Sequence, residues 1–185
     1  MTVHLVYPCE NLIKTPEVIG YIVSQALRAA GFEVVVHRWD SLGKIQPIEG
    51  DVLIGHAHPN PFTIFRRSLS EVGWAKRILM LPFSHDPKQL GFLREVVPQC
   101  DAFLAITGRY WIDTLNESIF AGWAPRMRHL DLAVNRAHFP RIKEHFNIAG
   151  ARKFLYIGHT RFFKNTAYLQ ELAQRFGPER FATIG

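Results

Sequence analysis

Two histidines stand at the end of an apolar run, at a spacing that metal sites use. His56 and His58 follow the residues DVLIG and are separated by one alanine. Alternate side chains of a strand point the same way, so histidines at this spacing can share one metal ion. The other interpretation is that one imidazole binds the backbone at the end of the strand and the other is solvated. Because no second set of metal-ligating residues follows at a suitable spacing, we expect no metal here.

A third histidine follows the next apolar run, in the segment SHDP. His85 and Asp86 stand in what the sequence predicts to be a tight turn after a strand. An imidazole can accept or donate a proton near neutral pH, so His85 is a candidate catalytic residue or a contact for a substrate hydroxyl. A purely structural turn closed by the Asp86 side chain is the alternative, and the sequence leaves both open.

Two further loops carry polar residues after predicted strands. Asn11 lies in PCENLIK, after the first strand, and Thr107 and Arg109 lie in TGRYW, after the fifth. Arg109 would open a helix, and helix N-termini attract anions. The alternative is an exposed arginine beside core aromatic residues. We include all three residues in the candidate cleft.

The late segment KFLYIGHTRFFKN predicts a phosphate-binding loop. Gly158 permits close approach of a ligand to the backbone, and Arg161 and Lys164 supply positive charge. Asn165 can cap the helix that follows, whose first amides would then face a phosphate.

Strands and helices alternate along the chain, and this order positions the loops. The predicted strands cover residues 3–7, 32–39, 51–57, 77–83 and 101–108, with a short strand within 127–134. The predicted helices cover residues 15–30, 62–75, 87–97 and 109–120. Such alternation predicts an α/β fold with a parallel sheet covered by helices on both faces. Ligands of these sheets bind beyond the carboxyl ends of the strands, the edge that the loops above share.

The pattern changes after Asn135. Residues 1–135 form the first predicted domain, and residues 136–152 mix proline, glycine and charges as linkers do. Residues 153–185 begin a second α/β unit with a strand at 153–157, a helix at 165–176 and a strand from 179. We expect this second unit to be incomplete.

Composition excludes several classes of protein. Of the 185 residues 48% are hydrophobic and 21% are charged, which is ordinary for a globular protein. No apolar run is long enough to span a membrane, the N-terminus does not read as a signal peptide, and the isolated cysteines predict reduced thiols in a cytoplasmic protein. The net charge of +6 favours anionic partners.

The basic run RRSLSEVGWAKR is either a solvated helix face or a peripheral contact with anionic membrane. Aromatic residues more often belong to the core than to surfaces that stack on bases, so we expect no nucleic-acid partner.

Five motifs in order resemble one enzyme family. DVLIGHAH, LPFSHDP, CDAFLAITGRYWIDTL, LDLAVNRAHFP and FLYIGHTRFFKN are similar, in this order, to segments of the GT-B-fold glycosyltransferases of the family-4 type. The resemblance covers essentially the whole chain. It implies an N-terminal Rossmann-like domain on the acceptor side, followed by the start of a domain that binds the nucleotide-sugar.

The resemblance also implies roles for particular residues. His85 corresponds to the active-site histidine on the acceptor side, and Lys164 to the lysine that binds the donor diphosphate. The diphosphate arginine of the family falls on His159, and Arg161 is its candidate substitute. The resemblance implies sugar transfer, usually with retention and without a metal or other cofactor, to a sugar, lipid or other small acceptor. The acidic motif of the donor domain is missing, so we expect this chain to be inactive by itself.

Two other functions stay open at this stage. One is a non-catalytic α/β module that binds a phosphorylated ligand. The other is a metal-dependent hydrolase built on His56 and His58.

Overall fold

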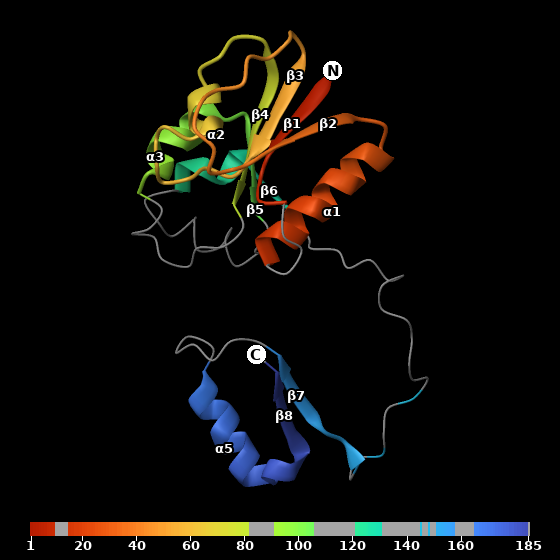
Figure 1. Cartoon of the computed structure of the whole chain (residues 1–185). Coiled ribbons are helices and arrows are strands. Elements are labelled where there is room, and N and C mark those ends of the chain that lie inside the picture. Colours follow the sequence, from red (N-terminus) through yellow and green to blue (C-terminus); the bar gives the residue numbers. More distant parts are fainter. Residues whose placement is uncertain are drawn as a thin grey trace. The chain divides into compact units, whose positions relative to one another are not determined.

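A computed structural model gives the fold of the chain in two compact units, Met1–Ala133 and Val134–Gly185 (Figure 1). The structure describes residues 1–9, 15–81, 91–105, 121–130, 145, 148, 151–157 and 165–184. The predicted domain boundary at residue 135 and most of the linker at 136–152 lie outside these ranges, so they stay predictions.

The first unit is built on a six-stranded sheet in which all neighbouring strands are parallel. The strand order is β2-β1-β3-β4-β5-β6. The strands are β1 (Thr2–Val6), β2 (Glu33–His37), β3 (Asp51–Gly55), β4 (Trp74–Leu81), β5 (Ala102–Ala105) and β6 (Met127–His129). Figure 1 shows α1 (Thr15–Ala29) on one side of the sheet and α2 (Ile64–Ser68) and α3 (Leu93–Val96) on the other. The predicted Rossmann-like sheet with helices on both faces is confirmed.

The core consists of two apolar clusters, one on each face of the sheet. On one face Leu53 of β3 packs with Phe65 of α2 and Leu93 of α3. On the other face Leu5 of β1 packs with Ile19 of α1. Leu5, Leu53, Phe65 and Leu93 are completely buried, and burial of such side chains contributes roughly 1.5–3 kcal/mol each.

Helix α1 ends as the sequence predicts. Gly31 has φ +88°, a conformation that glycine adopts without strain. Its amide donates to the carbonyl of Arg28 at 2.9 Å, and the amide of Phe32 donates to the carbonyl of Leu27 at 3.1 Å. This pair of hydrogen bonds is the Schellman arrangement, and it leads the chain directly into β2.

The predicted helix over 62–75 is wrong in its extent. Helix α2 ends at Ser68, and Trp74 already belongs to β4. Gly73, with φ +111°, lies in the turn that leads into the strand. The indole of Trp74 then packs in the core and donates to the carbonyl of Ser68 at 2.8 Å. Tertiary packing of one large side chain thus overrides the local helical pattern.

Shorter differences concern the next two elements. The predicted strand at 77–83 begins earlier, at Trp74. In the described part of the predicted helix at 87–97, helix begins at Leu93 and continues as a 3-10 turn, Val97–Gln99. The predicted helix at 109–120 lies outside the described residues.

The second unit is a strand–helix–strand arrangement. β7 (Phe154–Ile157) and β8 (Phe181–Ile184) pair in parallel, with α5 (Thr166–Phe176) and a 3-10 turn (Pro178–Arg180) between them. The rings of Phe154 and Phe181 stack with centroids 5.0 Å apart. The small parallel sheet agrees with the predicted second α/β unit.

Asn165 does not cap α5 in the predicted way. It lies at the N-cap position with φ +51° and ψ +47°, and its side chain makes no capping hydrogen bond. Side-chain caps need extended backbone at this position. The carbonyl of Asn165 instead accepts a hydrogen bond from the amide of Tyr168 at 3.1 Å.

Among the helices in the described part of the chain, none combines the length and the apolar content that crossing a membrane requires.

Candidate functional site

The structure describes two of the predicted site residues, His56 and His58. The others lie outside the described ranges: Asn11, His85, Asp86, Thr107, Arg109, Gly158, Arg161 and Lys164. Their predicted roles therefore stay predictions.

His56 lies where the order of the strands reverses. The chain passes from β1 to β2 on one side and then crosses to β3 on the other side of β1. At such a switch point the loops diverge, and parallel sheets bind ligands there. The amide of His56, directly after β3, donates to the carbonyl of Val6 at the end of β1 at 2.9 Å.

Gly55 makes this close approach feasible. A Cβ atom at this position would lie 2.8 Å from the Val6 carbonyl oxygen and 2.5 Å from the Phe65 ring. Only glycine leaves room for both neighbours, so its position fixes His56 against the end of β1.

The backbone fixes the tautomer of His56. Its Nδ1 lies 3.4 Å from the carbonyl oxygen of Met80 on β4. A carbonyl oxygen only accepts, so Nδ1 carries the hydrogen and Nε2 presents a lone pair. The imidazole also contacts the rings of Trp39 and Tyr7, with centroids 5.4 and 6.0 Å away.

Burial lowers the pKa of His56 to about 4, with a smaller contribution in the same direction from His58 and an opposing one from the hydrogen bond to Met80. The ring is therefore neutral at physiological pH. A group with this pKa is a weak base, so His56 is suited to accepting a hydrogen bond rather than to removing a proton.

His58 presents the opposite hydrogen-bonding group. Its Nδ1 accepts a hydrogen bond from the amide of Asn60 at 3.0 Å. In the neutral ring Nε2 therefore carries the hydrogen. The ring contacts the Trp39 indole with centroids 4.8 Å apart. Two histidines beside one indole thus present an acceptor and a donor.

Tyr7 adds a buried hydroxyl at the end of β1. The residue is 1% exposed, and its hydroxyl has no hydrogen-bond partner among the residues that the structure describes. Burial raises the pKa of this phenol, and the neighbouring Cys9 thiol raises it further. Tyr7 therefore remains a neutral donor and acceptor.

The sequence interpretation missed Tyr7 and Trp39. Both residues ended predicted strands, at 3–7 and 32–39, and were not considered for the candidate cleft. The available signal was their position, because Tyr7 directly follows β1 and Trp39 lies two residues after β2. The edge rule that selected the histidines applies to them equally.

These four residues, Tyr7, Trp39, His56 and His58, form what we call the carboxyl-edge cluster. It combines an indole, an acceptor nitrogen and an N–H with a buried hydroxyl. Within the described ranges no group of three histidine, cysteine or acidic side chains is arranged to hold a metal ion. The histidines at 56 and 58 each use Nδ1 for the backbone.

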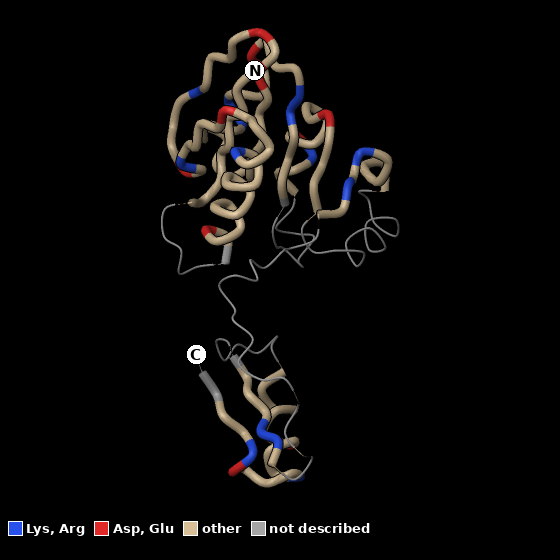
Figure 2. The backbone as a smooth tube through the Cα atoms, turned by 90° about the vertical axis from the view of Figure 1, so that its right-hand side faces the viewer, with Lys and Arg blue, Asp and Glu red and all other residues tan. Residues whose placement is uncertain are grey.

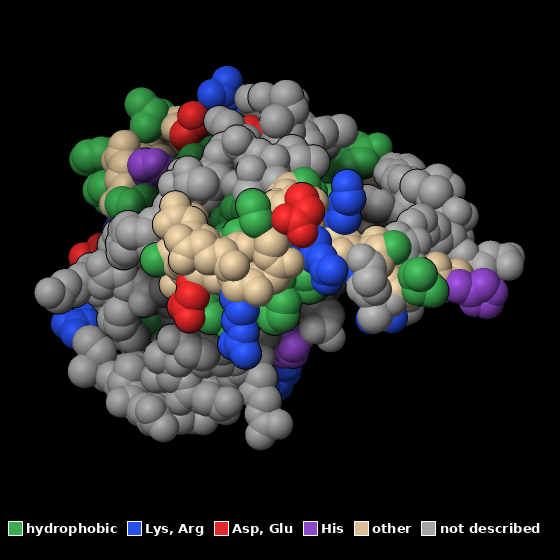
Figure 3. All heavy atoms as spheres, turned by 90° about the horizontal axis from the view of Figure 1, so that it is seen from below, with side chains coloured by type: hydrophobic (Ala, Val, Ile, Leu, Met, Phe, Trp, Pro, Cys, Tyr) green, Lys and Arg blue, Asp and Glu red, His purple; other side chains and the backbone are tan. Residues whose placement is uncertain are grey.

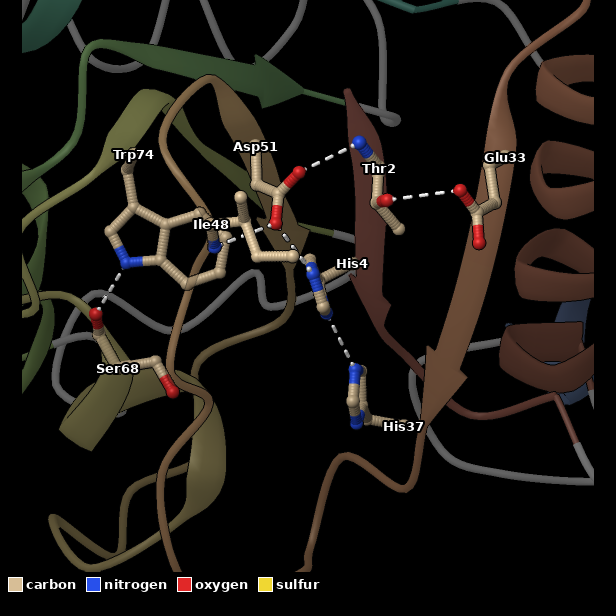
Figure 4. A network of polar contacts seen from close by, with 8 residues as sticks. All are labelled: Thr2, His4, Glu33, His37, Ile48, Asp51, Ser68 and Trp74. Carbon is tan, nitrogen blue, oxygen red and sulfur yellow. Dashed lines mark hydrogen bonds and ion pairs between the residues drawn. The ribbon is translucent and has the colours of Figure 1, made fainter.

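A second polar cluster lies on the first three strands and was not predicted (Figure 4). Asp51 accepts hydrogen bonds from the amides of Thr2 and Ile48 at 2.8 and 2.9 Å. Its carboxylate also lies 3.3 Å from Nε2 of His4, whose Nδ1 lies 3.0 Å from Nε2 of His37. We call Asp51, His4 and His37 the strand cluster.

The carboxylate of the strand cluster is stabilised in its ionised form. Burial would raise the pKa of Asp51, but the two backbone amides and His4 outweigh burial and hold that pKa below its usual value. Burial lowers the pKa of His37, and His4 lowers it further. Asp51 begins β3 and His4 lies within β1, whereas His37 ends β2, so the cluster runs from the start of one strand to the end of another and its polar atoms bind one another.

The basic run over residues 66–77 is partly engaged inside the first unit. Arg66 pairs with Glu95 at 2.6 Å and donates to the carbonyl of Pro59 at 2.7 Å. Arg77 donates to the carbonyls of Leu69 and Glu71 at 2.8 and 3.1 Å. These two arginines serve packing, which contradicts a fully solvated basic face.

Charges of both signs are interspersed on the described parts of the chain. Figure 2 shows Lys and Arg segments separated by uncharged and acidic ones along the tube. On the face drawn in Figure 3, basic, acidic and apolar side chains lie beside one another. The described residues of that face present no continuous basic patch.

Comparison with models of known protein families gives no match, and comparison with curated proteins gives none either. What is established is therefore the fold, an α/β chain with a Rossmann-like six-stranded parallel sheet and a small second parallel sheet.

Proposed function

We propose that this chain is the acceptor side, with the beginning of the donor side, of a glycosyltransferase. The proposed reaction moves a sugar from a nucleotide-sugar to a hydroxyl of a sugar, lipid or other small acceptor. The observation that carries the proposal is the carboxyl-edge cluster, in which His56 accepts and His58 donates beside the Trp39 indole.

The chemistry of a sugar matches these groups. A hydroxyl both donates and accepts, so neighbouring hydroxyls of one ring can bind an acceptor nitrogen and a donor nitrogen together. The C–H face of a sugar ring is apolar and packs on an indole. Pockets for small molecules combine aromatic walls with a few fixed polar groups in this way.

The proposed roles divide binding from chemistry. His56 has too low a pKa for a general base, so it orients the acceptor. His85, which follows β4 in the sequence, is the proposed active-site histidine. Asn11, Asp86, Thr107 and Arg109 are proposed to line the acceptor cleft from the loops of the same sheet edge.

The second unit is proposed to bind the donor. Gly158, Arg161 and Lys164 follow β7, and their charges would stabilise the leaving diphosphate in place of a metal ion. The support is the β7–α5–β8 arrangement, because a loop between a parallel strand and its helix is a common phosphate site. The nucleotide-sugar is a substrate, and no cofactor is proposed.

Acceptor binding is tested with the 185-residue chain. Neutral mono- and disaccharides are titrated while ligand NMR and tryptophan fluorescence are recorded. We expect at least one sugar to bind, with His56→Phe and His58→Phe each weakening it about tenfold, the loss of about one good hydrogen bond. His129→Phe, at an exposed position of β6, is the matched control and must bind as the unvaried chain does.

Transfer is tested with the protein in the length that its gene encodes. We expect acceptor-dependent release of a nucleoside diphosphate from one nucleotide-sugar, and a loss of about 100-fold or more in kcat for His85→Ala. Lys164→Ala should mainly raise the KM for the donor. No release from any nucleotide-sugar would overturn the proposal, and tight binding of a phosphorylated ligand without transfer would favour a non-catalytic phosphate-binding module.

A further inference from the structure

The two edges of the six-stranded sheet are protected very differently. At one edge β6 has three residues, of which Arg128 and His129 are exposed. At the other edge β2 has five residues, EVVVH, without lysine or proline. Natural sheets usually protect an open edge by short strands, charges, proline or a covering element. The β6 edge follows this rule and the β2 edge does not.

The β2 edge also exposes apolar surface on both faces of the sheet. Val35 and Val36 point to opposite faces and are 38% and 37% exposed. No described strand pairs with the outer side of β2. The Arg28 side chain donates to the carbonyl of Val34 at 3.2 Å, and a carbonyl oxygen retains a second lone pair for a strand partner.

The sequence of β2 is complementary to itself when two copies run antiparallel. With Val35 opposite its own copy, Val34 lies opposite Val36 and Glu33 lies opposite His37. Valine pairs stabilise directly opposed positions of a sheet, and Glu33 opposite His37 becomes an opposite-charge pair when the imidazole is protonated. A parallel pairing in register would instead place Glu33 beside Glu33.

The polar atoms at the two ends of β2 permit this pairing. Nε2 of His37 already contacts His4, which leaves Nδ1 for a group of a second copy. Glu33 uses Oε2 for the hydroxyl of Thr2, at 3.2 Å, which leaves Oε1. Because Nε2 of His37 donates to Nδ1 of His4, Nδ1 of a neutral His37 carries no hydrogen, and the carboxylate of one copy accepts a hydrogen bond from the imidazole of the other when that imidazole is protonated.

We propose that the β2 edge is an interaction surface for a second copy of this chain. The two β2 strands pair antiparallel about a two-fold axis at Val35, so that one continuous sheet runs through both first units. Such an interface is isologous, and it covers an edge with which no described strand pairs. This inference is independent of the proposed sugar transfer.

The first test is the mass of the chain in solution. Sedimentation velocity from micromolar to submillimolar concentration should show a mass of two chains. Val35→Lys should sediment as one chain, because two lysines cannot be placed opposite each other on the axis. Val72→Lys is the matched control, since Val72 is 91% exposed and lies outside β2. A single-chain mass for the unvaried protein at every concentration would overturn the proposal.

The second test fixes the register and does not depend on a destabilising change. Directly opposed residues of antiparallel strands have Cα atoms about 4.5 to 5.5 Å apart, which a disulfide can span. Val35→Cys should therefore form a covalent dimer on mild oxidation, whereas Val36→Cys, which faces Val34, should not. The unvaried chain, with Cys9 and Cys100, is oxidised in parallel and must remain uncrosslinked. Equal crosslinking of the two variants would contradict the proposed axis.

Discussion

The two imidazole clusters of the first unit lie on the same three strands and use their histidines in opposite ways. In the strand cluster a carboxylate, two backbone amides and two imidazoles bind one another. In the carboxyl-edge cluster Nδ1 of His56 and Nδ1 of His58 each form a hydrogen bond with the backbone, and both rings contact the Trp39 ring. In the first cluster the Asp51 carboxylate and both ring nitrogens of His4 are engaged within the chain, whereas in the second each histidine uses only Nδ1 for the backbone.

The difference teaches how position along a strand assigns a role to one residue type. Asp51, at the start of β3, accepts hydrogen bonds from the amide of Thr2, at the start of β1, and from the amide of Ile48, in the preceding loop. It therefore links two neighbouring strands of the sheet. His56, immediately beyond the end of β3, reaches the edge where parallel sheets bind ligands. Stability changes should therefore be largest in the strand cluster, and binding changes in the carboxyl-edge cluster.

The largest expected effect on stability is that of Asp51→Asn. The asparagine side chain has the same shape, but an NH2 group replaces one carboxylate oxygen. This group cannot accept the hydrogen bond that the amide of Thr2 or of Ile48 donates to that oxygen. Hydrogen bonds to a charged group contribute about 1.5–3 kcal/mol each, and a buried donor is left unsatisfied. We expect the free energy of unfolding in urea to fall by about 3 kcal/mol.

Asp40→Asn is the control for this substitution. Asp40 pairs with Arg38 at 3.1 Å on the surface, where such pairs contribute only a few tenths of a kcal/mol. Equal losses for the two substitutions would mean that the strand cluster does not fasten the sheet.

The next effect is a loss of stability in acid that depends on His56. Its pKa is about 4 in the folded chain and about 6.5 when unfolded. Above pH 6.5 both states are neutral; as the pH falls, the unfolded chain takes up the proton first, which favours unfolding. Linkage gives a loss of about 2 kcal/mol between pH 7 and pH 5 from this residue alone.

His56→Gln removes this titration and should reduce the measured loss by that amount. Urea unfolding at pH 7 and pH 5 supplies the four free energies that the comparison needs. His129→Gln, on β6, is the matched control and should keep the full acid loss. If His56→Gln also keeps it, the ring is not buried against Trp39 and Tyr7 as described.

The sheet was predictable from the sequence because its signals are local. β-branched runs mark β1, β2 and β3, and Thr15, Pro16 and Gly31 bound α1. The failures have two causes: the helix predicted at 62–75 was overridden by tertiary packing, and the cap predicted at Asn165 by the local backbone conformation. Trp74 was read as part of a helix because its partners, the strand β3 and the carbonyl of Ser68, are set by the tertiary structure.

The two clusters differ in the same respect. His56 and His58 follow from a rule about strand ends, which needs only the order of elements. The strand cluster joins His4 to residues 33 and 47 positions later. It depends on the register of three strands, which a single sequence does not specify to one residue.

A smaller effect is expected for His37→Gln, because glutamine can still donate to Nδ1 of His4. Burial lowers the pKa of His37, with His4 adding to the shift, so this residue too loses stability as the pH falls below about 6.5. We expect a cost of at most about 1 kcal/mol at pH 7, where the hydrogen bond remains. The free energy of unfolding of His37→Gln should also fall less steeply with decreasing pH than that of the unvaried chain. An unchanged acid profile would show that His37 titrates as it does in the unfolded chain.

The smallest expected effect on stability, and the sharpest test of the contrast, is that of Tyr7→Phe. The hydroxyl is buried and has no hydrogen-bond partner among the described residues, so its removal deletes no bond there. Removing an unsatisfied polar atom and keeping the ring should change the free energy of unfolding by less than about 0.5 kcal/mol, in either direction. Sugar binding, measured as for His56→Phe, should weaken if the hydroxyl serves the ligand. A loss of stability above about 1 kcal/mol with unchanged binding would instead place Tyr7 with the strand cluster, as a residue whose polar atom holds the fold together.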